Sequence, residues 1–529
     1  MTKRIVSLLC ALVLMLCAFA SAQVTPAGTF PVVDEPIVLK VATAVSSRCE
    51  DIETNAFTLW LEEKTGIDLQ FVQMSESDTA TQVNTIMLGD DLPDIFLGYN
   101  FGYSELCSYA DAGLILPLED YIAEYGDEYF NFLEQAAPSV GNAEAYATYN
   151  GHVYAVTTIA DMVTNMYANT KPRINEDFLA NLEMEMPTTL DEMYDYLVAV
   201  RDNDANGNGD PDDEIPMTGN ETNIKFLYST IGCCFQFTDY TTYLKVNENG
   251  EVEFVANNDL FKQTVEYIKM LVDDELLDPA AFTQAQADHL TLNTQADALV
   301  GLDVSYASNN YDSSSALWNA LSIIPNLEGP DGYKATYMTP LAVRRTLVMT
   351  KACENPEAAF RLFDLLLTDE AGAWGRLGVK DVDWKEAAEG LAGRDGDAAW
   401  YELIGAQVWT LPSQNHIWRT EAYLHGDVMN HVAEPADSST GKLAAGVFKY
   451  NLKNEVTGEL LPTLLMSAED DAEYGDLKKL IVDYVNSSIA SFALGGKSMD
   501  EWDAYVETIN NMGVERYVEL AQKAYDAMK

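Results

Sequence analysis

The chain has 529 residues, of which 48% are hydrophobic, so length and composition allow two large globular lobes and exclude an intrinsically disordered protein. Asp and Glu number 84 against 31 Lys and Arg, which gives a formal net charge of −53. A surface this acidic repels phosphate backbones and anionic lipids, so nucleic acid is excluded as a partner. The acidic coat is interpreted as a solvated surface that favours solubility rather than as a docking surface for a basic partner.

Residues 1–22 are predicted to be a signal peptide. Lys3 and Arg4 supply the positive charge, residues 5–19 are almost all apolar, and small residues occupy positions 20–22. Cleavage is predicted before Gln23, which implies export to the periplasm or the cell exterior. Lipid attachment at Cys17 is an alternative, although Leu16 stands where a small residue is usual. No other stretch approaches the roughly 20 apolar residues of a membrane span.

Five cysteines remain after the predicted cleavage: Cys49, Cys107, Cys233, Cys234 and Cys353. An odd number in a chain this large does not indicate a disulfide framework, and two adjacent cysteines fit the geometry of a bridge poorly. We therefore predict buried free thiols, with a Cys49–Cys107 disulfide as the alternative.

Strands and helices alternate after a Pro- and Gly-containing segment at residues 23–35, which is predicted to be a flexible leader. A strand at 37–42, a helix at 55–64 and a strand at 67–72 form a βαβ unit. A helix at 81–88 and a strand at 94–98 repeat the scheme, which predicts an α/β layered lobe. Ligands bind beyond the carboxyl ends of such strands, so the turns at 46–48 and 99–103 are candidate binding turns.

An acidic, glycine-containing segment at residues 202–214 is predicted to bind calcium with a structural role. It follows a predicted helix at 190–201 that begins with a Thr189–Glu192 capping box. Calcium takes about six to eight oxygen ligands, and oxygen-bearing side chains recur here at every second position. An EF-hand-like register begins at Asp202 and ends at Asp213 in place of the usual Glu; a second register begins at Asp204. A solvated acidic loop without metal is the alternative.

Several segments, in order, resemble the extracellular solute-binding proteins of sugar ABC importers, a family related in layout to maltose-binding and alginate-oligosaccharide-binding proteins. They are residues 57–71, 87–96 (MLGDDLPDIF), 149–156 (YNGHVYAV), 182–190 (LEMEMPTTL), 204–216 (DANGNGDPDDEIP), 325–332 (PNLEGPDG) and 494–525, which opens with LGGKSMDEWDAYV. Each segment is short, but their order and spacing span almost the whole mature chain.

The resemblance implies a two-lobed, periplasmic-binding-protein-like (type II) α/β fold, in which each lobe is a mixed sheet flanked by helices and a hinge joins the lobes. Lobe 1 is expected to comprise residues 36–160 and 338–368, and lobe 2 residues 161–337 and 369–529. Chain crossings are expected near 159–161, near 337–339 and after 367. A helix predicted at 355–367 agrees with this layout.

The resemblance also implies a function: a monomer that captures an oligosaccharide in an interlobe cleft and delivers it to the permease subunits of an ABC importer, without catalysis. Sugars present an apolar face to aromatic rings and hydroxyls to planar polar groups. The candidate ligand-binding residues are Ser46, Arg48, Tyr99, Asn100, Phe101 and Tyr103, and, on the second lobe, Asp161, Asp303, Tyr306, Trp374, Trp409, Trp418 and Arg419. For calcium, the resemblance implies Asp204, Asn206, Asn208, Asp210 and Asp213, with Asp212, Asp213 or Glu214 closing the shell.

Two other functions stay open. One is a peptide-binding protein of an ABC importer, and the other is a secreted glycoside hydrolase, because 84 acidic residues include ample material for a carboxylate pair. Motifs for other chemistries are missing from the sequence: no histidine begins an H-E-x-x-H helix, and no G-x-S-x-G turn occurs. Internal repeats, expected of a purely structural surface protein, are also missing.

Overall fold

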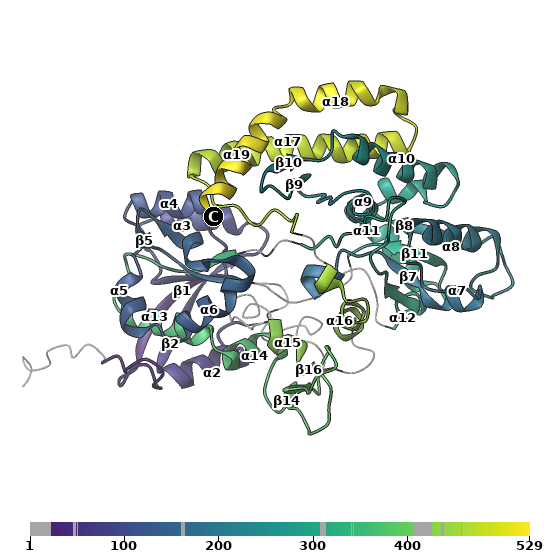
Figure 1. Cartoon of the computed structure of the whole chain (residues 1–529). Helices are drawn as coiled ribbons and strands as arrows, with labels where there is room; N and C mark the ends of the chain where they lie inside the picture. The colour runs from purple at the N-terminus through teal and green to yellow at the C-terminus, as the bar shows by residue number, and fades with distance from the viewer. Residues whose placement is uncertain are drawn as a thin grey trace, which may run out of the picture. The chain divides into compact units, whose positions relative to one another are not determined.

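The computed structural model describes residues 23–45, 49, 51–159, 164–306, 314–339, 341, 343–405, 426–434, 439–455 and 458–529. The chain divides into two compact units (Figure 1). The first unit contains the described residues up to Ile159 together with Val343–Trp384 and Ile404–Gly405. The second contains the described residues of Ala160–Ala342, Lys385–Leu403 and His425–Lys529.

A five-stranded mixed sheet forms the centre of the first unit. Its strands, in the order β2-β1-β3-β13-β6, are β2 (Ile67–Ser75), β1 (Ile37–Val45), β3 (Ile95–Leu97), β13 (Val343–Met349) and β6 (Val156–Ile159). β1 pairs in parallel with β2 and β3, whereas β13 is antiparallel to both β3 and β6. The carboxyl ends of β1, β2, β3 and β6 therefore share one edge of the sheet with the start of β13.

Helices flank this sheet in the first unit (Figure 1). They are α2 (Ala56–Thr65), α3 (Thr79–Met87), α4 (Tyr103–Asp111), α5 (Glu119–Tyr125), α6 (Glu128–Val140), η1 (Ala143–Ala147), α13 (Pro356–Leu366) and α14 (Asp369–Leu377), with a hairpin of β4 (Thr148–Tyr149) and β5 (His152–Val153). The predicted strands and helices of residues 37–98 are confirmed to within a few residues at each end. The apolar faces explain this agreement, because Leu39, Val41, Phe57 and Leu61 are completely buried.

The segment 23–35 is packed, which corrects the prediction of a flexible leader. The Val32 amide donates to the Thr65 carbonyl at 2.9 Å, and the Val32 side chain is fully buried. The Arg361 guanidinium of α13 donates to the carbonyls of Thr25 and Thr29 at 2.8 Å each. Burial of the valines and these hydrogen bonds offset the entropy of ordering the segment.

The boundary between the units also differs from the expected one. Residues 369–384 were expected in the second lobe, but Trp374 of α14 lies 5.5 Å, centroid to centroid, from Trp60 and 6.2 Å from Phe57, both on α2. Glu370 forms an ion pair with Lys64 on the same helix. These contacts place α14 in the first unit. The chain leaves that unit after Ile159 and after Trp384, and it returns at Val343 and again at Ile404.

The second unit has a four-stranded mixed sheet in the order β12-β7-β11-β8: β12 (Leu321–Ile323), β7 (Arg173–Asn175), β11 (Val300–Val304) and β8 (Ile215–Gly219). β11 is parallel to β8 and antiparallel to β7, and β12 is antiparallel to β7. One edge of this sheet therefore gathers the carboxyl ends of β8, β11 and β12 and the start of β7.

The helices of the second unit are α7 (Glu176–Asn181), α8 (Leu190–Asp202), α9 (Lys225–Gly232), α10 (Asp259–Asp273), α11 (Gln286–His289), α12 (Ala316–Ala320), α15 (Gly426–Asn430), α16 (Ser439–Lys449), α17 (Ala468–Ala493), α18 (Trp502–Asn511) and α19 (Val514–Ala527). Shorter turns are η2 (Thr164–Ala168), η3 (Pro279–Phe282), η4 (Leu290–Thr294), η7 (Leu452–Glu455) and η8 (Met499–Glu501). α17 packs against α10 and α19, so the C-terminal helices share a core with the sheet and α8 (Figure 1).

Two small sheets complete the described strands. β9 (Leu244–Val246) and β10 (Val252–Phe254) form a hairpin, and β14 (Trp384–Glu386), β15 (Tyr401–Leu403) and β16 (Val432–Ala433) form a three-stranded sheet. The Thr189–Glu192 capping box is confirmed at the start of α8, where the Glu192 amide donates to Thr189 Oγ1 at 3.1 Å. All five described cysteines are buried and free, so the Cys49–Cys107 alternative is not formed. Among the described residues, no helix combines the length and apolar character required to cross a membrane.

Candidate functional site

The turn after β3 brings three predicted ligand-binding residues to the sheet edge of the first unit. The Tyr99 hydroxyl donates to Glu105 at 2.9 Å, and the Tyr103 hydroxyl donates to the Thr148 carbonyl at 2.9 Å. The Asn100 side-chain oxygen accepts from the Arg345 amide of β13 at 2.9 Å. Burial, followed by the bond to Glu105, raises the pKa of Tyr99 to about 12, so its hydroxyl stays protonated and can act as a hydrogen-bond donor.

Arg345 holds this turn in place, although sequence analysis did not select it. Its guanidinium donates to the carbonyls of Tyr146 and Phe101 and lies 5.4 Å from the ring centroid of Tyr103. The turn and β13 are far apart in the sequence, so only the pairing of β3 with β13 brings them together.

Phe101 belongs to the core, which corrects its assignment as a sugar platform. Its side chain is completely buried, and its ring makes edge contacts with Phe96 at 5.5 Å and Tyr99 at 4.8 Å. A ring without exposed surface cannot stack on a sugar, so Phe101 supports Tyr99 from behind.

In the second unit, Tyr306 follows β11 at the sheet edge and is held by the segment that precedes β7. The side-chain amide of Asn169 donates to the Tyr306 hydroxyl at 3.0 Å. The buried Arg173 guanidinium donates to the carbonyls of Ser305 at 2.6 Å and Asn169 at 3.2 Å. Arg173 thus fixes both sides of this contact, and the Tyr306 ring stays partly exposed.

Tyr306 begins a group of four rings that we call the aromatic row, which consists of Tyr306, Phe226, Tyr240 and Tyr337. Neighbouring centroids are 6.5 Å apart between Tyr306 and Phe226, and 5.5 Å apart in each of the next two pairs. Tyr306 and Tyr240 are partly exposed, whereas Phe226 and Tyr337 are buried. Burial raises the pKa of Tyr240 to about 12, so the row presents neutral phenols. An apolar surface with hydroxyl groups along it suits a sugar ring.

Asp303 is an internal residue of β11, which corrects its assignment as a hydrogen-bonding partner of the ligand. The side chain is completely buried. Its carboxylate lies 2.9 Å from Nε2 of the buried His289 and accepts a bond from the Ser305 hydroxyl at 3.0 Å. The Asp303 carboxylate therefore stabilises the strand that leads to Tyr306 and does not face a ligand.

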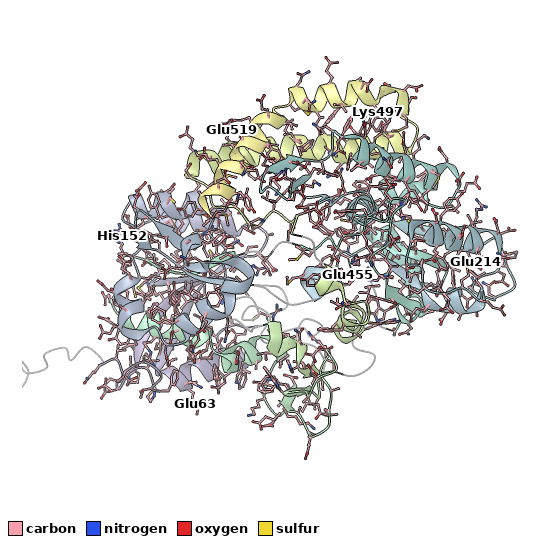
Figure 2. The ribbon with its side chains drawn as sticks, viewed as in Figure 1. Glu63, His152, Glu214, Glu455, Lys497 and Glu519 are labelled. Carbon is pink, nitrogen blue, oxygen red and sulfur yellow. The ribbon has the colours of Figure 1, made fainter. Side chains whose placement is uncertain are left out.

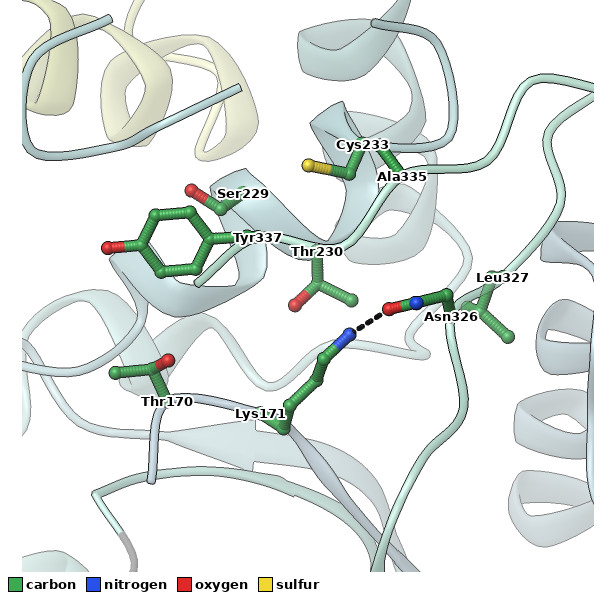
Figure 3. Close-up of a pocket in the computed structure, with 9 residues that line it drawn as sticks. All are labelled: Thr170, Lys171, Ser229, Thr230, Cys233, Asn326, Leu327, Ala335 and Tyr337. Carbon is green, nitrogen blue, oxygen red and sulfur yellow. Dashed lines mark hydrogen bonds between the residues drawn. The ribbon is translucent and has the colours of Figure 1, made fainter. Parts of the chain in front are cut away.

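A polar pocket lies beside the aromatic row (Figure 3). Its lining residues are Thr170, Lys171, Ser229, Thr230, Cys233, Asn326, Leu327, Ala335 and Tyr337. The Lys171 ammonium donates to the Asn326 side-chain oxygen inside this pocket, and both side chains are buried. The pocket joins the start of β7, helix α9 and the segment that follows β12.

A chain of charged and polar groups leads from the pocket to the surface. The side-chain amide of Asn326 donates to the Glu455 carboxylate at 2.7 Å, and Glu455 forms an ion pair with Lys334 at 3.0 Å. Burial lowers the pKa of Lys171 to about 8, and burial raises the pKa of the neighbouring Cys233 thiol to about 12. Lys171 is therefore partly neutral near pH 8, while Cys233 stays a thiol.

The lowered pKa of Lys171 has a measurable effect on stability. The unfolded chain binds this proton more tightly than the folded one, so the lysine opposes folding at neutral pH and the penalty falls as pH rises. Between pH 8 and pH 9.5 the free energy of unfolding of the wild type should rise by roughly 1 to 2 kcal/mol relative to Lys171→Met. Chemical denaturation of both proteins, with the exposed Lys351→Met as control, checks this. If the difference in unfolding free energy between the wild type and Lys171→Met stays constant from pH 8 to pH 9.5, the prediction is wrong.

Several predicted ligand-binding residues lie outside the described part of the chain: Ser46, Arg48, Asp161, Trp409, Trp418 and Arg419. Trp374 lies within it, but its ring packs on α2 of the first unit rather than belonging to the second. The signal peptide predicted for residues 1–22 also lies outside the described residues.

The acidic segment after α8 folds into a compact loop that ends at β8. The Gly209 amide donates to Asp204 at 2.8 Å, and the Asn206 amide donates to Glu214 at 3.0 Å. The side-chain amides of Asn206 and Asn208 lie 2.9 and 2.8 Å from the Asp213 carboxylate. Figure 2 labels Glu214 at the end of this loop. The side chains at every second position therefore converge, as their spacing predicts.

The geometry favours the register that begins at Asp204. Asp202 pairs with Arg201 at 2.7 Å instead of joining the loop, and the side chain of Asp212 is exposed. Two buried oxygens in the loop, Asp204 Oδ1 and Glu214 Oε2, have no hydrogen-bond partner among the described residues. Burial raises the pKa of Glu214. Unpartnered buried carboxylate oxygens are costly, and a bound cation would satisfy both of them, so these residues fit calcium.

Sequence analysis missed much of the sheet-edge chemistry in the second unit. Lys171, Asn326, Tyr240 and Tyr337 come from four separate segments and meet only through strand order and packing. One signal was available, because Lys171 and Asn326 flank short strands as the candidate turns do. Nothing in the local pattern of Tyr240 distinguishes it from a core tyrosine.

The chain is similar to a known protein family and to several characterised proteins. The family model for bacterial extracellular solute-binding proteins matches residues 50–373. The fructooligosaccharide ABC transporter substrate-binding protein FusA of Streptococcus pneumoniae serotype 4 is 26% identical over 513 residues, which cover 94% of this chain and 91% of the relative. The polygalacturonan/rhamnogalacturonan-binding protein YtcQ of Bacillus subtilis is 21% identical over 476 residues, which cover 89% and 88%.

Solved structures agree on the fold. FusA in complex with kestose has a TM-score of 0.69 at 23% identity and covers 93% of this chain and 99% of its own; a FusA EF-hand mutant in complex with fructo-nystose gives the same values. A solute-binding protein of Bifidobacterium longum infantis, described as HMO-binding, has a TM-score of 0.73 at 20% identity and covers 93% and 99%. The chain has the two-lobed α/β fold of solute-binding proteins, with a mixed sheet flanked by helices in each unit.

Proposed function

The chain belongs to the family of bacterial extracellular solute-binding proteins, and on this basis we propose that it captures an oligosaccharide and delivers it to the permease subunits of an ABC importer. The observation that carries the proposal is the aromatic row beside a polar pocket at the sheet edge of the second unit. Tyr99, Asn100 and Tyr103 supply a matching set of hydrogen-bonding groups at the sheet edge of the first unit.

In this proposal the oligosaccharide binds between the lobes and is left chemically unchanged. The lobes hinge where the chain passes between them. The oligosaccharide first binds one lobe, and its further contacts with the other lobe form only in the closed state, so the ligand binds the closed state more tightly and favours it. The permease recognises the closed form. Release follows when transport separates the lobes. The proposed protein is a monomeric binding protein that carries out no covalent step.

A carbohydrate ligand is favoured over a peptide. FusA, YtcQ and the Bifidobacterium protein are all named for carbohydrate ligands. The partly exposed tyrosines of the aromatic row offer flat rings with hydroxyl groups, which suits a pyranose or furanose face better than an extended peptide backbone.

We also propose that the 202–214 loop binds one calcium ion with a structural role. Asp204, Asn206, Asn208, Asp213, Glu214 and the Asp210 carbonyl would hold it. Asp204 Oδ1 and Glu214 Oε2, which have no hydrogen-bond partner among the described residues, support this set, and one solved structure of FusA is that of an EF-hand mutant. When bound, calcium would join the end of α8 to the start of β8. Export through the predicted signal peptide completes the proposal.

A glycan panel tests the function. The mature protein is incubated with fructans, pectic and milk oligosaccharides, cello- and malto-oligosaccharides and short peptides, and thermal stability and sugar release are followed together. At a ligand concentration 100 times Kd, binding to the folded state alone stabilises it by about 2.7 kcal/mol. We expect at least one glycan to raise Tm without being cleaved. Release of shorter sugars would identify a hydrolase, and a response to peptides alone would overturn the carbohydrate assignment.

A further inference from the structure

A second cluster of metal-binding groups lies in the second unit, remote in sequence from the 202–214 loop. It consists of Asp395, Asp397 and His431, whose ligand atoms all lie within 4.8 Å of one another. The two carboxylates belong to the loop between β14 and β15, and His431 directly precedes β16. Asp395 and His431 are largely buried, and Asp397 is exposed. We propose that these three side chains bind a divalent transition metal ion, with Zn²⁺ as the best fit.

The distance between His431 and Asp395 suits a shared cation better than a direct contact. His431 Nε2 and Asp395 Oδ2 are 3.7 Å apart. Protein hydrogen bonds between nitrogen and oxygen rarely exceed about 3.2 Å. Two ligands bound to zinc at about 2.0–2.1 Å in tetrahedral geometry are separated by roughly 3.4 Å. The observed gap is therefore close to the spacing of two ligands of one metal ion.

The backbone and an aromatic ring hold the three groups in place. The Trp400 ring stacks on the His431 imidazole with centroids 4.2 Å apart and planes at 13°. The Trp400 amide donates to the His431 carbonyl at 2.7 Å, and the Asp397 amide donates to Asp395 Oδ1 at 3.1 Å. Gly393 allows the loop to reach His431, because a Cβ there would lie 2.7 Å from the His431 Cα. The geometry is thus set before any metal binds.

The ligand chemistry selects the metal. Calcium prefers oxygen ligands only, whereas one imidazole nitrogen with two carboxylates suits zinc. The adjacent Arg394 forms a buried ion pair with Glu434, so its charge is compensated and does not oppose a cation. Three protein ligands leave a fourth zinc position for water. A bound ion would join two segments on either side of β15 and clamp the three-stranded sheet.

Isothermal titration with ZnCl₂ tests this site on the full mature protein, in excess calcium so that the 202–214 loop is saturated. We expect one Zn²⁺ per chain, with affinity reduced roughly tenfold or more in His431→Ala and Asp397→Asn. Asp397→Asn is included because its side chain is exposed, so this variant is expected to fold as the wild type does. The control His152→Ala removes a surface histidine that pairs with Glu119, and should bind zinc as the wild type does.

A spectroscopic readout locates the ion. Cobalt bound at His431 should quench Trp400, whose ring stacks on that imidazole, and Trp400→Phe should remove this quenching while the protein still binds cobalt. Three results would overturn the proposal. They are the absence of measurable zinc binding, the same zinc affinity in the wild type, His431→Ala and Asp397→Asn, and a loss of zinc affinity in His152→Ala alone. Each result is independent of glycan binding.

Discussion

Calcium at a concentration 1,000 times its Kd is expected to raise the free energy of unfolding by about 4 kcal/mol. The reason is that Asp204 and Glu214 place buried oxygens that lack a hydrogen-bond partner within the described part of the chain in a loop that connects α8 to β8, and only the folded chain brings them together. Chelation should therefore lower Tm substantially. Asp204→Asn and Glu214→Gln should each remove most of the calcium-dependent stabilisation, measured by denaturation with and without calcium.

Asp212→Asn is the matched control for this prediction. Asp212 lies in the same loop and carries the same charge, but its side chain is exposed. We expect this variant to keep the calcium response of the wild type. If Asp212→Asn loses the response while Glu214→Gln keeps it, the register that begins at Asp204 and ends at Glu214 is wrong. If the wild type is equally stable in calcium and in chelator, calcium has no structural role in this protein.

Asp303→Asn should lower the free energy of unfolding by about 3 kcal/mol, as expected when one partner of a buried pair is lost. Asp303 is completely buried against His289 at 2.9 Å and accepts from Ser305, so the variant leaves His289 buried without its carboxylate. Urea denaturation near pH 6 measures the loss. Asp288→Asn, an exposed neighbour of His289, should change stability by less than about 0.5 kcal/mol. A stable Asp303→Asn would return Asp303 to the list of ligand-binding candidates.

The pH dependence of this pair has a defined sign. Burial alone would lower the pKa of His289, but the charge and hydrogen bond of Asp303 outweigh it, so the pKa is raised above its ordinary value. The stabilisation is fully present below the unfolded pKa of about 6.5 and is lost as pH rises through the higher folded pKa. The stability gap between the wild type and Asp303→Asn should be widest at mildly acidic pH and should narrow above neutrality.

Local patterns predicted the elements that depend on local sequence. The strand and helix of residues 37–65 follow from apolar periodicity and from Gly66, which ends α2 with φ of 76°. The capping box of α8 is equally local. The leader was mistaken for a flexible segment because its anchors, Thr65 and the Arg361 guanidinium, lie far along the chain. Trp374 was assigned to the wrong unit for the same reason.

The candidate binding residues were harder to predict because exposure depends on tertiary packing. Phe101 and Asp303 have the right chemistry beside strand ends, but their side chains point into the core. Tyr306, a candidate from the sequence, is a partly exposed ring at the end of β11, whereas Tyr240 and Tyr337 join it only through contacts across the fold. The 202–214 loop was the most predictable candidate site, since its oxygen-bearing side chains recur within one short segment.

Titration calorimetry with the glycan that most raises Tm tests the central claim most directly, applied to the wild type, Tyr306→Ala and Tyr306→Phe. We expect one glycan per chain, recovered intact. Affinity should fall roughly tenfold or more, about 1.4 kcal/mol, in Tyr306→Ala and stay near that of the wild type in Tyr306→Phe, which keeps the ring. Unchanged affinity in Tyr306→Ala would remove the aromatic row from the site, and recovery of shorter sugars would contradict a binding protein that leaves its ligand unaltered.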